Sequence, residues 1–275
     1  MTESSRRTDP PLDRVLALAT EALAAEPAGL LTDFDGTLSP IVADPAAARL
    51  VDGATDGLEA LTHRLAVVAV VTGRAPLDAR RMTGLPGLLI AGNHGMEWLE
   101  PGADEPAASP EAARVRERIG RVMARIPELH GVTVEDKGLS ATVHYRSARE
   151  PDSARSALVE ALGELEPELE LRPGRMSLEI RPVGLGDKGA AARTIIERFG
   201  LRGVLVMGDD VTDLDMFRAV DELRRAGRLR GAIIGVGGDD REVPAEVAEA
   251  ADALLGDPAE AAVFLAALAG TPAPS

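Results

Sequence analysis

Short apolar segments alternate along the chain with longer stretches of helical character. Continuous Val, Ile and Leu runs that end in polar or glycine residues lie at 29–33, 67–72, 88–92, 204–209 and 231–236, with a weaker run at 253–255. Strands buried on both faces of a parallel sheet have this composition. Helix candidates lie at 12–25, 54–65, 76–82, 188–199 and 214–226. The alternation predicts an α/β fold with a doubly wound, mostly parallel sheet and a Rossmann-like core.

The stretch from 105 to 182 does not follow this alternation. A helix candidate at 110–126 precedes an alternating pattern around Asp136-Lys137-Gly138, and a second at 152–165 precedes two alternating runs around Pro173-Gly174. Alternating runs around a turn signal are typical of β-hairpins. We therefore expect an α+β domain of order αββαββ at 105–182, a small antiparallel sheet covered by two helices. It would be inserted between the two parts of the core, 1–104 and 183–275.

Charge and composition narrow the range of partners. The chain has 45 Asp and Glu against 30 Lys and Arg, a formal net charge of −15, which disfavours nucleic acid and anionic membranes as partners. It contains no cysteine, so disulfides and thiolate metal sites are excluded. The N-terminus has no apolar stretch like that of a secretory signal, and the longest apolar run, 261–270, is too short for a membrane span. We expect a soluble, cytoplasmic protein and a monomer.

Polar residues follow the carboxyl ends of the predicted strands, which is where open α/β sheets bind their ligands. Lys188, one of only two lysines, begins a predicted helix near the same edge. The residues at the strand ends are Asp33, Asp35, Gly36 and Thr37 after the first strand, Thr72, Gly73 and Arg74 after the second, Asn93 and His94 after the third, and Asp209 and Asp213 after the fourth.

A phosphate monoester is the ligand that accounts for these charges together. A carboxylate nucleophile that approaches a phosphate dianion at ~4 Å meets repulsion on the order of 8 kcal/mol at an effective dielectric of about 20. Asp33, Asp209 and Asp213 offer the oxygen ligands that Mg²⁺ prefers, and Lys188 adds a compact positive charge. Thr72 and backbone N–H groups after Asp33 would bind the remaining phosphoryl oxygens.

The two aspartates of the first motif suit different chemical roles. Asp33 closes the first strand and is predicted to be the nucleophile that forms an aspartyl-phosphate. Asp35 lies two residues later, so it is close enough to protonate the leaving oxygen and afterwards to activate water.

In this order the motifs resemble those of haloacid-dehalogenase-type phosphatases, and more closely those of trehalose-6-phosphate phosphatases. The matching segments are DFDGTLSPI (33–41), VTGR (71–74), GNHGME (92–97), EDKGLSATVHYR (135–146), LEIRP (178–182), DKGAA (187–191) and GDDVTDLDMF (208–217). The resemblance implies Mg²⁺, hydrolysis of trehalose 6-phosphate to trehalose, and a mobile cap between the second and third motifs. It also implies that Asp35 meets the metal through its main-chain carbonyl. Phe34 and Leu214 depart from the family pattern, where Tyr and an acid are common.

The inserted domain offers a candidate surface for sugar recognition. Leu139, Ala141, Val143 and Tyr145 alternate with Ser140, Thr142, His144 and Arg146, and Glu179 and Arg181 alternate with Leu178 and Ile180. If the helices cover the apolar face, the other face is open. Lys137, His144, Arg146 and Glu179 are then candidates for hydrogen bonds to sugar hydroxyls. The predicted phosphate-side contacts are Gly36, Thr37, Gly73, Arg74, Asn93 and His94.

Several alternatives stay open from the residues alone. Asp209 and Asp213 are also typical of acids that favour a helix N-terminus, His94 of a structural histidine, and the polar face of the inserted domain of a solvated sheet. A response-regulator receiver, a sugar-phosphate mutase, a phosphatase of sucrose or mannosylglycerate phosphate, and a catalytically silent sugar-phosphate binder each share part of this pattern.

Overall fold

The computed structural model describes residues 12–42, 44–108, 110–174, 176–183, 187–237 and 243–271. The chain divides into two compact units. The core unit is formed by Met1–Pro106 and Asp187–Ser275, and the inserted unit by Ala107–Gly186. The use of the inserted unit as a cap stays a prediction.

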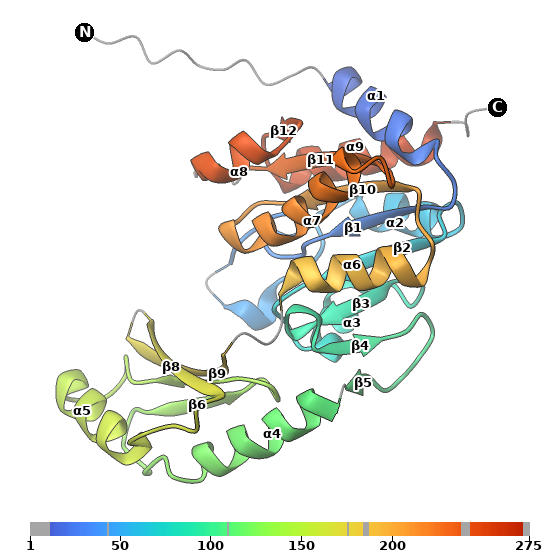
Figure 1. Cartoon of the computed structure of the whole chain (residues 1–275). Helices are drawn as coiled ribbons and strands as arrows, with labels where there is room; N and C mark the ends of the chain where they lie inside the picture. The colour runs from blue at the N-terminus through green and yellow to red at the C-terminus, as the bar shows by residue number, and fades with distance from the viewer. Residues whose placement is uncertain are drawn as a thin grey trace, which may run out of the picture. The chain divides into compact units, whose positions relative to one another are not determined.

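Seven strands of the core and β5, the first residues after its first segment, form a sheet in the order β12-β11-β10-β1-β2-β3-β4-β5 (Figure 1). Its strands are β1 (Ala28–Thr32), β2 (Val67–Val71), β3 (Leu89–Gly92), β4 (Glu97–Leu99), β5 (Ala107–Ala108), β10 (Gly203–Gly208), β11 (Arg230–Val236) and β12 (Ala253–Leu255). Neighbours from β12 to β3 pair in parallel, whereas β3 and β4 pair antiparallel. The predicted α/β fold with a mostly parallel sheet is confirmed.

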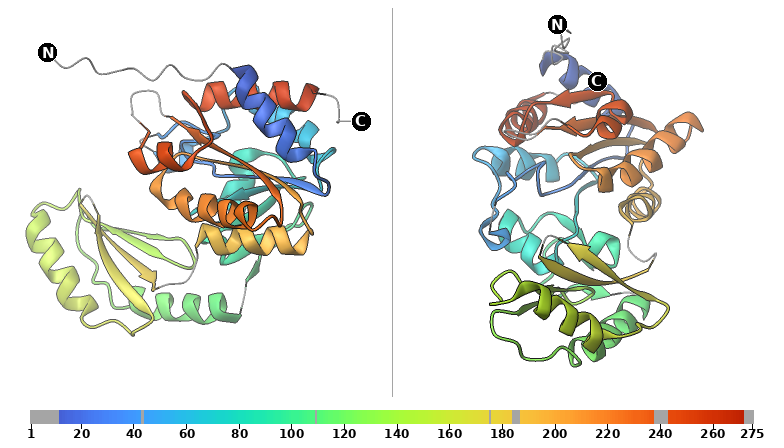
Figure 2. Two further views of the ribbon diagram at one scale, coloured as in Figure 1. Left: turned by 45° about the horizontal axis from the view of Figure 1, so that its top comes forward. Right: turned by 90° about the vertical axis from the view of Figure 1, so that its left-hand side faces the viewer.

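Helices cover both faces of this sheet (Figure 2). Leu30 of β1 belongs to one buried cluster and Leu31 to the other, because successive side chains of a strand point to opposite faces. The first cluster takes in α1 (Leu12–Leu23), α2 (Ala54–Thr62), α3 (Pro76–Thr83) and α9 (Pro258–Gly270), and the second α6 (Lys188–Arg198), α7 (Leu214–Arg225) and α8 (Ala245–Ala250).

The end of the chain contains helices that the apolar pattern did not predict. Helix α9 covers the run at 261–270, which was considered only as a membrane candidate. It packs against α1 and α2, and Phe264 and Leu265 are fully buried. Within the described part of the chain, no helix is long and apolar enough to cross a membrane.

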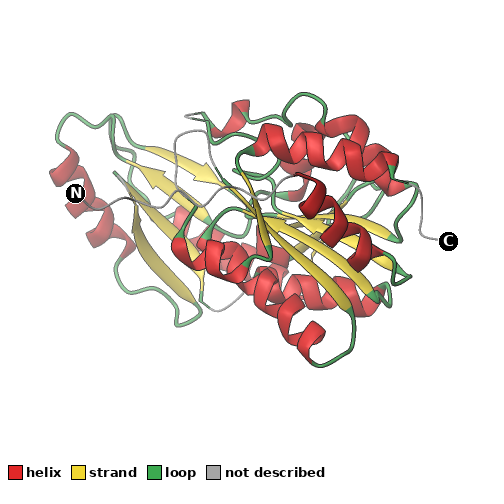
Figure 3. Ribbon diagram, turned by 90° about the horizontal axis from the view of Figure 1, so that it is seen from above, coloured by secondary structure: helices red, strands yellow, loops and turns green. Residues whose placement is uncertain are grey.

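The inserted unit has a four-stranded antiparallel sheet of its own, in the order β6-β7-β9-β8, and two helices (Figure 3). Along the chain its elements are α4 (Pro110–Met123), β6 (Thr133–Asp136), β7 (Ala141–His144), α5 (Pro151–Leu162), β8 (Leu169–Gly174) and β9 (Ser177–Pro182). Leu139, Ala141 and Val143 are fully buried, while His144 is half-buried and Arg146 exposed. Thr142 belongs to the polar face but is buried, with only 7% of its surface exposed.

The second hairpin of this unit does not turn at Pro173-Gly174, and that prediction is wrong. Both residues belong to β8 and pair with Leu178 and Ser177 of β9. β8 is an edge strand, and edge strands are where a sheet tolerates proline. Position 175, between the two strands, lies outside the described residues.

Candidate active site

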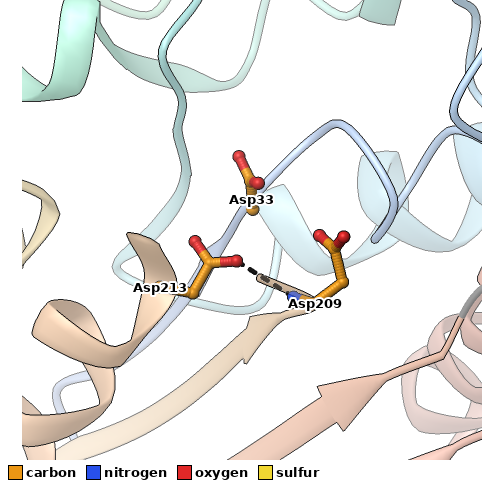
Figure 4. Close-up of side chains that lie close together, drawn as sticks. All are labelled: Asp33, Asp209 and Asp213. Atoms are coloured by element: carbon orange, nitrogen blue, oxygen red, sulfur yellow. Dashed lines mark hydrogen bonds between the residues drawn. The ribbon is translucent and has the colours of Figure 1, made fainter. Parts of the chain in front are cut away.

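Three carboxylates meet at the carboxyl edge of the core sheet. Asp33 directly follows β1 and Asp209 directly follows β10, and these two strands pair in parallel. Asp213 comes from the short helix η3 (Val211–Asp213) ahead of α7. One carboxylate oxygen of each residue lies within 4.8 Å of the others (Figure 4). The structure thus brings together the three acids that the sequence pattern selected.

Lys188 is buried between two of these acids. Its helix begins here because the Asp187 side chain accepts hydrogen bonds from the N–H groups of Gly189 and Ala190. The Lys188 ammonium lies 2.9 Å from Asp33 Oδ1 and 2.6 Å from Asp213 Oδ1, and the side chain is only 3% exposed. A compact charge therefore lies beside the candidate nucleophile.

Asp213 organises the loop around it. Its Oδ2 accepts hydrogen bonds from the N–H groups of Asp209 (2.9 Å) and Asp210 (3.1 Å), and its Oδ1 accepts one from Lys188. A Cβ at Gly208 would lie 2.6 Å from the Asp213 side chain, so only glycine allows this close approach. Asp213 thus fixes the loop that carries Asp209 and orients Lys188.

Burial and the neighbouring charges shift the pKa values of the cluster. Burial raises the pKa of Asp33 well above its ordinary value, against the opposing effect of the Lys188 charge. Burial, with a further contribution from the charge of Asp213, raises the pKa of Asp209 from 3.8 to about 7. Burial would lower the pKa of Lys188, but the charges of Asp33 and Asp213 outweigh it and raise that pKa.

These observations fit a divalent cation. Three carboxylates lie beside one buried ammonium, and the pKa values of Asp33 and Asp209 are raised, by burial above all and further by the neighbouring carboxylates. Carboxylate oxygens are the donors that hard cations such as Mg²⁺ prefer. Asp33 and Asp209 would hold the ion; both oxygens of Asp213 accept hydrogen bonds, and its predicted contact to the metal stays a prediction.

Gly36 and Thr37 lie directly against Asp209. Gly36 has a φ of +81°, and a Cβ there would lie 2.0 Å from Asp209 Oδ2, so this position requires glycine. The Thr37 hydroxyl donates a hydrogen bond of 2.9 Å to Asp209 Oδ1. Both residues therefore shape the acidic cluster, and their predicted contacts to substrate stay predictions.

Asp35 has a different partner from the other acids. Arg74 binds its carboxylate with two parallel hydrogen bonds, Nε to Oδ2 at 2.7 Å and Nη2 to Oδ1 at 2.6 Å. The same guanidinium donates to the carbonyl of Pro45 and lies over the ring of Phe34, 5.6 Å from its centre. The side chain of Arg74 is predicted to contact substrate, and in this structure it binds Asp35, the predicted general acid.

The ends of β2 and β3 meet at the same edge. Thr72 is 1% exposed, and its hydroxyl accepts a hydrogen bond of 3.2 Å from the N–H of Arg74. The N–H of His94 donates to the carbonyl of Thr72 at 2.9 Å, and the His94 ring lies against Gly73. Asn93 is buried and donates to Glu97 through its side chain.

Of the polar residues predicted for the inserted unit, His144 and Glu179 lie in β7 and β9, and Lys137 directly follows β6. Glu135 contacts both His144 (Nε2 to Oε2, 3.3 Å) and Lys137 (Nζ to Oε2, 3.8 Å). The strand register then aligns Glu135 with Thr142, and Thr142 with Glu179. Sequence reasoning did not select Glu135, although its position two residues before Lys137 was a usable signal. Arg146 follows β7 and is exposed.

A buried lysine among carboxylates at the carboxyl ends of parallel strands is the arrangement expected of a haloacid-dehalogenase-type phosphatase, the class that the motifs of this chain resemble. A family model described as Trehalose-phosphatase matches residues 31–237. The chain therefore belongs to the trehalose-phosphatase family, as the resemblance of its motifs predicted.

Individual relatives agree with this assignment. The chain is 37% identical over 272 residues to a trehalose-phosphate phosphatase of Mycobacterium avium, an alignment that covers 94% of this chain and 66% of that protein. It thus spans just under two thirds of the length of that curated relative. A trehalose-6-phosphate phosphatase of Aspergillus fumigatus has a similar structure, with 28% identity, a TM-score of 0.59, and 95% and 99% of the two chains covered. The C-terminal domain of the Candida albicans trehalose-6-phosphate phosphatase shares the fold, at 22% identity and a TM-score of 0.66, over 98% of this chain and 100% of that one.

Proposed function

We propose that this protein is a Mg²⁺-dependent phosphatase that hydrolyses trehalose 6-phosphate to trehalose and phosphate through an aspartyl-phosphate on Asp33. The observation that carries the proposal is the cluster of Asp33, Asp209, Asp213 and Lys188 at the carboxyl edge of the sheet. Membership of the trehalose-phosphatase family supports the substrate class, since a relative named as a trehalose-phosphate phosphatase aligns over most of this chain.

In the first half of the reaction Asp33 is the nucleophile. An oxygen of its carboxylate attacks phosphorus, and the bond between phosphorus and the sugar oxygen breaks. The carboxyl group of Asp35 gives its proton to that leaving oxygen. Lys188 contacts Asp33 directly and offsets the repulsion between carboxylate and phosphate. Mg²⁺ bound by Asp33 and Asp209, and by the main-chain carbonyl of Asp35, would supply further positive charge to the phosphoryl oxygens.

In the second half water replaces Asp33 on phosphorus. The Asp35 carboxylate takes a proton from water, whose oxygen attacks the aspartyl-phosphate. The bond between phosphorus and the Asp33 oxygen breaks, which releases phosphate and restores both aspartates. Thr72 and the backbone after Asp33 bind the remaining phosphoryl oxygens.

The ion pair with Arg74 gives Asp35 a resting position. Two N–H donors of Arg74 occupy both carboxyl oxygens of Asp35, so Asp35 must leave the guanidinium before it can reach the leaving oxygen of a substrate. We propose that Arg74 holds Asp35 until substrate arrives, and that the freed guanidinium then binds substrate.

The inserted unit would recognise the sugar. Lys137, His144, Arg146 and Glu179 provide both donors and acceptors, which sugar hydroxyls require. This assignment makes the unit a specificity cap and separates recognition from chemistry.

Phosphate release from a panel of sugar phosphates, with Mg²⁺ and with excess chelator, tests the proposal. We expect release from trehalose 6-phosphate that needs Mg²⁺ and far less from the phosphates of sucrose, mannosylglycerate and glucose. Asp33→Asn is the control for contaminating phosphatase. Binding without release would identify a silent binder, transfer to another sugar position a mutase, and preference for another compound a different sugar phosphatase.

A further inference from the structure

The turn after β3 has an uncommon backbone conformation. Asn93, His94 and Gly95 follow one another with φ values of 49°, 56° and 91°. Glycine adopts such values readily, but residues with a side chain seldom do, and these conformations persist only where their surroundings impose them. Asn and His adopt this region more often than other residues with a side chain, but two of them in succession before a glycine make a turn that its contacts have to stabilise.

Backbone hydrogen bonds tie the turn to the end of β2. The N–H of Asn93 donates to the carbonyl of Arg74 at 2.8 Å, and that of His94 to the carbonyl of Thr72 at 2.9 Å. A Cβ on Gly73 would lie 2.8 Å from Nε2 of His94, so the imidazole lies directly against this glycine. The conformation of the turn therefore sets where the His94 ring lies relative to the Thr72 segment.

The other side of the turn contacts the helix that carries Lys188. A Cβ on Gly95 would lie 2.6 Å from the Cβ of Ala191, which is three residues after Lys188 on α6. Three consecutive residues thus lie between the Thr72 segment and the first turn of α6. A change in the conformation of this turn would therefore displace the Thr72 segment and the first turn of α6.

The Glu97 carboxyl group holds this turn from the adjacent strand. Asn93 Nδ2 donates to Glu97 Oε2 at 2.5 Å, and each of the two residues is 3% exposed. Glu97 is the first residue of β4 and pairs with Gly92, the residue immediately before the turn. A buried carboxyl group is costly unless hydrogen bonds compensate its lost hydration, so packing alone does not explain an acid here.

We propose that Glu97 is a positioning residue of the phosphoryl site. It holds the side chain of Asn93, and through it the left-handed turn that sets His94 against Gly73 and links Thr72 to the helix of Lys188. The inference rests on the proposed function and adds a residue to it.

Exchanging donor and acceptor within the pair tests this role. Asn93→Asp removes the amide donor and places the new carboxyl group against that of Glu97. We expect kcat to fall about 10- to 100-fold for both trehalose 6-phosphate and p-nitrophenyl phosphate, because phosphoryl-binding groups are displaced for either substrate. Adding Glu97→Gln restores one N–H···O bond with the roles reversed, and most of the lost kcat should return. Leu99→Val on the same strand is the control: it lowers the unfolding temperature without changing kcat below that temperature.

The outcomes separate this inference from the proposed function. If Asn93→Asp keeps the wild-type kcat, the positioning role is overturned. It is also overturned if the double variant folds but has a kcat as low as that of Asn93→Asp. If Asn93→Asp does not fold, the double variant must fold and hydrolyse both substrates. A double variant that does not fold or has no activity overturns the positioning role. If the wild-type protein releases phosphate from neither compound, the proposed function fails. The NMR signal of the His94 imidazole then decides: it must shift in Asn93→Asp and return in the double variant, and an unmoved signal overturns the inference.

Discussion

At the scale of single residues, the active site depends on what each charged group contacts. Lys188 shows this most clearly, because its Nζ lies within 2.9 Å of Asp33 and 2.6 Å of Asp213 in a space that is almost closed to solvent. Asp33 and Asp213 are equally enclosed. The space between these two carboxylates accepts one compact cationic side chain, so the shape of that side chain is as important as its charge.

We therefore expect Lys188→Arg to be severely impaired although the charge is kept. The planar guanidinium is larger than an ammonium and does not fit the point between the two carboxylates. The loss in kcat should be about 10²- to 10³-fold, as for removal of a group that stabilises the transition state. Steady-state kinetics on the purified variant measure this, and a wild-type rate would show that the position of the charge is unimportant.

Asp213→Asn should cost stability as well as activity. Its two carboxylate oxygens accept three hydrogen bonds, and an amide offers only one oxygen acceptor. We expect the free energy of unfolding to fall by about 1–3 kcal/mol, the cost of a buried group left without its partner. Asp210→Asn is the matched control, since Asp210 is exposed and an amide oxygen can still accept from Val211. Equal unfolding midpoints of the two variants in urea would contradict this account.

At the scale of elements, the sequence predicted most strands of the core sheet because its buried parallel strands are continuous apolar runs. Asp33 and Asp209 were expected to lie together because each follows the carboxyl end of a strand. The structure has them together, since the register of the parallel strands β1 and β10 brings these ends side by side. The short antiparallel strand β4 carried no such signal: it has three residues, of which Glu97 is a buried acid. Helix α9 was missed because it is apolar on all sides and shows no helical periodicity.

The pairing of individual side chains was less predictable. Nothing in the spacing of Asp35 and Arg74 reveals that they bind each other, because the contact depends on how the ends of β1 and β2 approach. The same holds for Asn93 and Glu97, whose hydrogen bond follows from the β3–β4 hairpin. Residue types at strand ends thus indicate the chemistry, while the partner of each side chain depends on how the strand ends approach in the folded protein.

The sheet of the inserted unit supports a prediction that separates recognition from catalysis. Arg146→Ala or Glu179→Ala should reduce kcat/KM for trehalose 6-phosphate about ten- to a hundredfold, equivalent to about 1.5–3 kcal/mol for a lost hydrogen bond to a charged group. Hydrolysis of p-nitrophenyl phosphate should be nearly unchanged, because this small substrate lacks the sugar. Arg155→Ala, an exposed change on helix α5, is the matched control. Equal losses on both substrates would assign these residues to catalysis or folding instead.

At the scale of the whole molecule, the acidic cluster couples stability to pH. The pKa of Asp209 is raised from 3.8 to about 7, so between these values the folded protein binds more protons than the unfolded chain. The metal-free protein should therefore lose stability as the pH rises from about 4 to about 7, by at most a few kcal/mol from this residue. Asp209→Asn removes the penalty and should unfold at a higher temperature than wild type above pH 7, but not near pH 4.

Mg²⁺ provides the complementary measurement. The ion should raise the unfolding temperature of the wild-type protein at pH 8 and leave that of Asp209→Asn nearly unchanged, since binding to the folded state alone stabilises it. Asp210→Asn, which changes the neighbouring exposed acid, should respond like wild type. A wild-type protein whose unfolding temperature does not respond to Mg²⁺ would contradict the assignment of Asp209 as a ligand.

Mass spectrometry of the protein quenched in acid during turnover tests the central claim most directly. Wild-type protein mixed with trehalose 6-phosphate and Mg²⁺ should yield one peptide that is heavier by a single phosphoryl group, with the modification on Asp33. Asp33→Asn should yield none and should release no phosphate. Phosphate release without labelled Asp33 at any quench time, or undiminished turnover in Asp33→Asn, would contradict the account.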